Sequence, residues 1–127
     1  MTGIIDYGVG NLHSVSKALA ALGVESRIVS DGRGFSRCDR LILPGVGAFP
    51  DAMEAIKPLE GDIRAAVRDG VPLMSICLGM QMLFEYSDEC GGAKGLGILP
   101  GVVRRFPDGL IVPHMGWSPL YNMRGDL

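Results

Sequence analysis

The chain has 127 residues, of which 47% are apolar, and this is the size and composition of one domain with its own core. Its formal net charge is −2 and no window concentrates basic residues, so a nucleic-acid partner is not expected. The odd count of three cysteines without CxxC spacing points to a reducing cytoplasm, the two histidines argue against a metal site, and no apolar run approaches the roughly 18 residues that span a membrane.

The first unit of the chain is predicted to be a strand, a turn and a helix. Residues 3–8 form a short apolar run, and the glycines that follow allow a sharp turn. Asn11 is a good helix cap, and the spacing of Val15, Leu19 and Leu22 predicts the buried stripe of a helix that ends at a glycine. The turn lacks the third glycine of a dinucleotide fingerprint, so a Rossmann cofactor site is rejected and no cofactor is expected.

A second and a third strand follow. Residues 24–29 alternate as a strand does, residues 30–34 have the composition of a loop, and residues 41–43 form a buried strand. That strand ends at a Pro-Gly-Val-Gly run at 44–47, where proline removes a donor and glycine frees the backbone to bend. Such a loop is either an ordinary strand-to-helix turn or an oxyanion hole made of backbone amides. Taken alone, the loop favours the ordinary turn.

The stretch 73–81 has the pattern of a nucleophile elbow. Helical patterns at 52–56 and 63–68, separated by Pro58, lead into it. An apolar strand then stops at Cys77, and a helix begins directly after it, so the thiol is expected at the tip of a strained turn. A helix N-terminus favours the thiolate, which is the nucleophilic form. Unpaired cysteines are also often buried core residues. From this stretch alone, a nucleophile and a core residue are equally good interpretations of Cys77.

Three successive strand–helix repeats predict an α/β fold, with a mostly parallel sheet and helices on both faces. The glycine turn after the first strand, the 44–47 loop and Cys77 then share the carboxyl edge of the sheet, where open sheets bind ligands. Past residue 87, residues 102–106 and 110–112 are predicted to form a C-terminal antiparallel hairpin. Trp117 is either a partial core filler or an exposed anchor for a partner. We expect residues 1–127 to form a single domain.

Four stretches together resemble one known family. They are IDYGVGNL at 5–12, PGVGAF at 44–49, CLGMQ at 77–81 and PHMGW at 113–117. In the same order, they are similar to stretches of the glutaminase subunits of imidazole glycerol phosphate synthase, which are class I glutamine amidotransferases with a flavodoxin-like fold. The resemblance covers the whole of this chain.

The resemblance implies a role for each matching residue. Cys77 would attack the side-chain amide of glutamine, releasing ammonia and leaving a glutamyl thioester. The oxyanion and substrate-binding residues would be Gly45, Val46, Gly47, Leu78 and Gln81. Ammonia would pass to a (βα)₈-barrel cyclase subunit in histidine biosynthesis, and Asn11 and Trp117 would lie on the face that docks this barrel.

The sequence departs from the family pattern at three places. Ser75 stands where the family usually has glycine beneath the elbow, and Ser118 stands where it usually has asparagine after the tryptophan. The family's His-Pro-Glu segment, which supplies the general base and its carboxylate, has no match in this chain. Neither His13 nor His114 is a convincing substitute, so the catalytic His and Glu are expected to be absent and the chain alone inactive.

These observations support one main function and two alternatives. The leading interpretation is the glutaminase of an imidazole glycerol phosphate synthase. The first alternative is a non-catalytic interaction module that keeps the fold and docks a synthase. The second, a free-standing Cys-elbow hydrolase, requires a histidine that the sequence does not place. Self-association is also expected, through an unpaired strand edge and an uncovered apolar face.

Overall fold

The computed structural model describes residues 1–119 and 121, so the expected domain over 1–127 includes seven positions, 120 and 122–127, outside the described residues. Its centre is a sheet of four parallel strands in the order β2-β1-β3-β4. These strands are β1 (Thr2–Ile5), β2 (Ser26–Val29), β3 (Arg40–Gly45) and β4 (Leu73–Cys77). The predicted α/β class with a mostly parallel sheet is confirmed.

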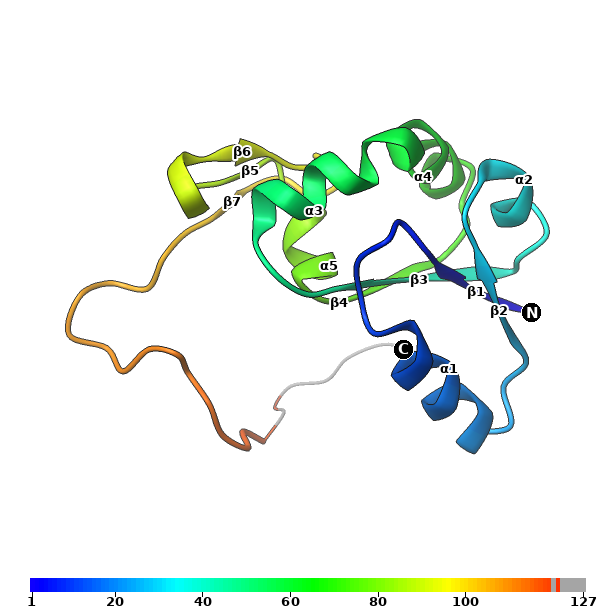
Figure 1. The fold of residues 1–127 in the computed structure, drawn as a ribbon, viewed down its shortest axis with the longest axis horizontal. Helices are drawn as coiled ribbons and strands as arrows, with labels where there is room; N and C mark the ends of the chain where they lie inside the picture. The colour runs from blue at the N-terminus through cyan, green and yellow to red at the C-terminus, as the bar shows by residue number, and fades with distance from the viewer. Residues whose placement is uncertain (120, 122–127) are drawn as a thin grey trace.

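Helices lie on both faces of this sheet, as predicted (Figure 1). One face carries α1 (Leu12–Ala21), and the other carries α3 (Phe49–Ile56), α4 (Glu60–Arg68) and α5 (Leu78–Met82). Asn11 caps α1 as expected, because its side-chain oxygen accepts a hydrogen bond from the Ser14 N–H at 3.1 Å. The predicted break at Pro58 is present as a short 3₁₀ turn, η1 (Lys57–Leu59), between α3 and α4.

The main hydrophobic core cluster lies on one face of the sheet. It joins side chains of the strands to those of α3, α4 and α5, and its members include Ile5, Leu41, Leu43, Phe49, Ile56, Ile63 and Met82. Helix α1 contributes no buried residue, so its predicted buried stripe is wrong: Val15 and Leu19 are half-buried and Leu22 is 77% exposed. The reason is that α1 packs against β1 and β2 at one side of the sheet and leaves the same face of β4 open.

The predicted loop at 30–34 is wrong in part, because residues 32–35 form a short helix, α2 (Gly32–Phe35). The side chain of Asp31 accepts a hydrogen bond from the Gly34 N–H at 2.6 Å and so caps the first turn. Phe35 at the end of this turn is buried in the core. A polar cap and one buried aromatic side chain therefore outweigh the glycines in this segment.

The small second sheet differs from the predicted hairpin. Its strands β5 (Tyr86–Ser87), β6 (Ala93–Lys94) and β7 (Val102–Val103) run in the order β6-β5-β7, and a 3₁₀ turn, η2 (Glu89–Gly91), follows β5. The antiparallel pair is β5 with β6, whereas β7 joins β5 in parallel, and residues 110–112 form no strand. The chain after β7 runs away from both sheets (Figure 1).

No helix in the described part of the chain has the length and apolarity needed to cross a membrane.

Candidate functional site

Cys77 stands at the tip of a strained turn between β4 and α5. Its φ is 56° and its ψ is −119°, a combination that costs a residue with a side chain about 1–3 kcal/mol. Such strain persists only where the surrounding structure imposes it, and here it projects an exposed cysteine from the carboxyl end of a strand. This is the geometry of a nucleophile elbow.

Two glycines allow the helix of the elbow to lie directly on the neighbouring strand. A Cβ atom on Gly79 would stand 2.2 Å from the Leu43 carbonyl oxygen, and one on Gly45 would stand 2.4 Å from the Gly79 backbone nitrogen. Any side chain at either position would therefore push α5 away from β3. The close contact beneath Cys77 depends on this pair of glycines.

Ser75 lies in β4, paired in register with Leu43 of β3. Its hydroxyl oxygen is buried and has no hydrogen-bond partner among the described residues. The family's usual glycine at this position suggested that serine would alter the packing. In this structure the tight approach of helix to strand is made at Gly45 and Gly79.

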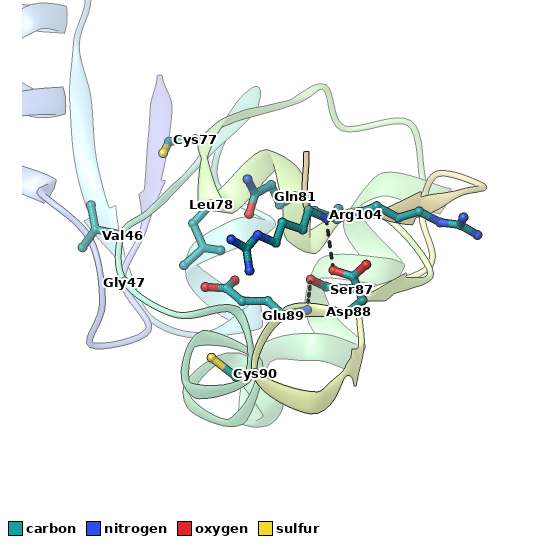
Figure 2. Close-up of a pocket in the computed structure, with 12 residues that line it drawn as sticks. Val46, Gly47, Cys77, Leu78, Gln81, Ser87, Asp88, Glu89, Cys90 and Arg104 are labelled. Atoms are coloured by element: carbon teal, nitrogen blue, oxygen red, sulfur yellow. Dashed lines mark hydrogen bonds between the residues drawn. The ribbon is translucent and has the colours of Figure 1, made fainter. Parts of the chain in front are cut away.

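A cavity of about 570 Å³ opens beside Cys77 (Figure 2). The structure brings five of the sequence-predicted site residues to its wall, namely Cys77, Val46, Gly47, Leu78 and Gln81. Gly45 does not line the cavity; it is buried under the elbow, opposite Cys77 in the β3–β4 register. Segments 30 or more residues apart in sequence thus form one site at the carboxyl edge of the sheet.

A hydrogen bond fixes the first residue of the 44–47 loop, and the last residue has a backbone conformation that favours glycine. The hydroxyl of Tyr7, just after β1, donates a hydrogen bond to the Pro44 carbonyl oxygen at 3.0 Å. Burial raises the pKa of Tyr7 to about 12, so its hydroxyl remains protonated near neutral pH. At the other end, Gly47 adopts a φ of 95°, which favours glycine.

The opposite wall of the cavity is made of residues that the sequence analysis did not identify. Glu89 accepts a hydrogen bond from the Phe49 N–H through Oε2 at 3.1 Å, and its own N–H donates to the buried Ser87 hydroxyl at 3.2 Å. Arg104 and Arg105 complete this wall with Asp88, and neither arginine forms an ion pair with a carboxylate within the described residues. The wall therefore carries both signs of charge in the cavity that Cys77 also lines.

The sequence contains only part of the information needed to predict this wall of the cavity. The polar run at 87–89 interrupts the chain between an apolar helix and a glycine-rich stretch. Its position in the site depends on the parallel pairing of β5 with β7, which brings Arg104 and Arg105 back beside it. No periodic pattern in the sequence predicts a pairing of two-residue strands.

The two histidines lie away from Cys77. His13 is an exposed residue of α1, on the face of the sheet opposite α5. His114 lines a separate cavity with Phe106, Leu110 and Ile111. Neither histidine lines the Cys77 cavity, so neither is placed as its base.

The two residues predicted to contact a partner are both exposed. Asn11 is occupied as the cap of α1, and Trp117 is fully exposed in the segment that runs away from the sheets. Of the two interpretations of Trp117, core filler and exposed anchor, the structure excludes the first.

Comparison with known proteins gives a consistent result. The family model described as glutamine amidotransferase class-I matches residues 3–117. The imidazole glycerol phosphate synthase subunit HisH of Geobacillus thermodenitrificans is 53% identical over 94% of this chain and 60% of its own length. The subunit of the same name from Streptococcus sanguinis is 52% identical over 92% of this chain and 58% of its own length. The chain thus spans about three fifths of these relatives.

A solved structure shares the fold. It is described as a glutamine amidotransferase, with a TM-score of 0.71 and 24% sequence identity, over 87% of this chain and 59% of that one. At this identity the match bears on the architecture alone.

Proposed function

The chain belongs to the class I glutamine amidotransferase family, and we propose that it forms the nucleophile-bearing part of the glutaminase of an imidazole glycerol phosphate synthase. Its two curated relatives above are named as subunits of that synthase. The observation that carries the proposal is the strained Cys77 facing a cavity whose wall holds Val46, Gly47, Leu78 and Gln81. In this proposal, residues 1–127 are part of one amidotransferase-like domain.

Cys77 is the nucleophile of the proposed reaction. Its sulfur attacks the δ-carbon of glutamine, forming a C–S bond and a tetrahedral oxyanion. The Leu78 N–H, which follows the nucleophile, and the amides of the 45–47 loop stabilise that oxyanion. The C–N bond then breaks, the nitrogen takes a proton and leaves as ammonia, and water hydrolyses the thioester to glutamate.

The charged wall suits the other end of the substrate. Glutamine carries an ammonium and a carboxylate at its α-carbon, and the wall across from Cys77 offers Glu89 and Asp88 beside Arg104 and Arg105. Because neither arginine is paired with a carboxylate in the described part of the chain, both are available to an anionic group. This arrangement favours an amino acid over a simple amide.

In this proposal, neither histidine of this chain is the general base of the reaction. The family uses a histidine followed by proline and glutamate, whereas His13 is followed by serine and His114 by methionine. A positioned base contributes on the order of a hundred- to ten-thousandfold in rate. The 127-residue polypeptide is therefore expected to show little or no glutaminase turnover by itself or with a barrel subunit added.

The proposed partner is a (βα)₈-barrel cyclase in the cytoplasm, docked over Asn11 and Trp117. A fully exposed tryptophan in an extended segment is the kind of aromatic anchor that dominates protein interfaces. Self-association of the isolated chain is part of the same proposal, because the open face of β4 exposes Met74 and Ile76.

Covalent trapping tests glutamine binding without requiring a base. A chloroketone analogue of L-glutamine is expected to modify Cys77, with protection by L-glutamine and no protection by D-glutamine. The Cys77→Ala variant should lose the adduct, and peptide mapping should find Cys90 unmodified. Modification that both enantiomers block equally, or that falls on Cys90 instead, would contradict a glutamine site.

Protection of Cys77 by L-glutamine distinguishes the glutaminase from the alternative, a non-catalytic interaction module. The observation behind the alternative is that neither histidine lines the Cys77 cavity. A module would bind the barrel, with the Trp117→Ala variant weakened, yet show no L-glutamine protection of Cys77. Robust glutamate release that disappears in Cys77→Ala would instead show that a group in this chain serves as the base, against the assignment above.

A further inference from the structure

Tyr7 connects two separate parts of the sheet at the edge of the candidate site. It follows β1, its side chain is only 7% exposed, and its hydroxyl donates to the Pro44 carbonyl oxygen at 3.0 Å. Pro44 opens the glycine loop that leads to Val46 and Gly47 on the cavity wall. The bond therefore joins a buried side chain of the core to the first peptide of this loop.

The direction of that peptide follows from the sheet. The register of β1 with β3 ends at Ile4 opposite Ile42, so Pro44 lies beyond the last paired residue on the β1 side. On the other side, the Leu41 N–H donates to the Pro72 carbonyl at 2.8 Å, next to β4. Because alternate residues of a strand point their backbone groups to the same neighbour, Gly45 faces β4 as Leu41 does, and Pro44 faces β1.

Tyr7 and β4 thus hold the Pro44–Gly45 peptide from its two sides. A trans peptide is planar, with its C=O and N–H pointing in opposite directions. Holding the Pro44 carbonyl on the β1 side keeps the Gly45 N–H on the β4 side, where Gly45 is opposite Cys77 in the register. Without the hydroxyl, the buried Pro44 carbonyl loses its partner, and the loop beyond β3 is no longer fixed on the β1 side.

We propose that Tyr7 is a positioning residue for the oxyanion loop: its hydroxyl fixes the Pro44 carbonyl where β3 passes into the loop, and so sets where the amides of Val46 and Gly47 lie relative to an oxyanion formed at Cys77. This inference rests on the proposed function of the same site. The hydroxyl remains a donor well above neutral pH, because burial raises the pKa of Tyr7 to about 12. The hydroxyl can therefore donate to the Pro44 carbonyl at neutral pH.

Two reactions of Cys77 separate loop orientation from general folding. Acylation by p-nitrophenyl acetate passes through a tetrahedral oxyanion, whereas alkylation by iodoacetamide is a direct displacement without one. The rates of both at Cys77 are measured by peptide mass mapping in the wild type and in Tyr7→Phe. We expect the ratio of acylation to alkylation to fall at least about tenfold in Tyr7→Phe, since losing a whole oxyanion donor costs on the order of a hundred- to a thousandfold.

Matched controls keep the outcome unambiguous. Tyr86→Phe removes a phenolic hydroxyl from a residue outside the cavity wall and should leave the ratio unchanged. The buried Cys38 reports folding in the same sample, because it stays unmodified while the core is intact. If Tyr7→Phe kept the wild-type ratio, or if both rates at Cys77 changed by the same factor, the positioning role would be overturned.

The test also separates this inference from the proposed function. Neither reagent resembles glutamine, so the ratio measures the oxyanion loop alone. Failure of the chloroketone trapping with a tenfold lower ratio in Tyr7→Phe would reject glutamine as substrate and retain the role of Tyr7. Successful trapping with an unchanged ratio would retain glutamine as the substrate and reject the role of Tyr7.

Discussion

Replacement of Gly79 by alanine tests the packing that creates the elbow. The new Cβ atom would stand 2.2 Å from the Leu43 carbonyl oxygen and 3.1 Å from the Leu43 carbonyl carbon. Since Cβ atoms essentially never approach another heavy atom within 3.0 Å, α5 and β3 must separate by at least about 0.8 Å. Both obstacles are backbone atoms, so no side-chain rotation relieves the overlap.

The expected cost follows from this overlap. Overpacking a core typically costs about 1–3 kcal/mol, and a clash between two backbones belongs at the upper end, at about 3 kcal/mol. The higher helix propensity of alanine offsets up to about 1 kcal/mol of this cost. The net fall in the free energy of unfolding is about 2 kcal/mol, which lowers the urea midpoint by about 1 M for an m-value of about 2 kcal/mol/M.

Urea denaturation followed by circular dichroism measures this fall, with Gly61→Ala as the matched control. Gly61 also lies in a helix, α4, but a Cβ atom there meets nothing within 4 Å. Its midpoint should stay unchanged or rise slightly. Equal midpoints for Gly79→Ala and the wild type would refute the claim that α5 rests directly on β3. A matching loss in Gly61→Ala would show that the effect belongs to helical glycines in general.

Three further predictions follow from the same structure. Cys77 should react with limiting iodoacetamide before Cys90 and well before the buried Cys38, and mapping that finds Cys90 modified first would remove the argument from the elbow. Because burial raises the pKa of Tyr7 from 10.0 to about 12, its protonated form stabilises the fold fully below pH 10, and this contribution is lost as pH rises toward 12. At about 1.4 kcal/mol per pKa unit, this contribution is on the order of 2–3 kcal/mol. Between pH 10 and pH 12, the free energy of unfolding should therefore fall by this much more in the wild type than in Tyr7→Phe. Equal falls in the two proteins would contradict the prediction. Light scattering should show concentration-dependent association of the isolated chain that Met74→Lys reduces, whereas a monomer at all concentrations would mean that the open sheet face does not pair.

Much of the fold follows from local patterns. The short apolar runs predicted the strands of the parallel sheet, Asn11 predicted the start of α1, and Pro58 predicted the break between α3 and α4. The abrupt change from apolar strand to Cys77 predicted the elbow. Each of these signals acts through the conformational preferences of a few neighbouring residues, so it can be detected without knowing what packs against them.

The local patterns failed where burial or long-range pairing decided the outcome. The spacing of Val15, Leu19 and Leu22 is correct for a helix, but burial of that stripe depends on how much of the sheet lies beneath α1. The hairpin was misplaced because Val102–Val103 pairs in parallel with β5 rather than with its sequence neighbour. A two-residue strand has too little pattern of its own to specify its partner.

By itself, the sequence determined the candidate nucleophile, the glycine loop and the family resemblance, because each consists of residues close together in the chain. Only the tertiary structure decided what completes the site. It placed Glu89, Arg104 and Arg105 across the cavity from Cys77, and it joined the Tyr7 hydroxyl to the Pro44 carbonyl across 37 positions of sequence. A hydrogen bond depends on distance and direction in space, and residues so far apart acquire both only when the sheet has formed.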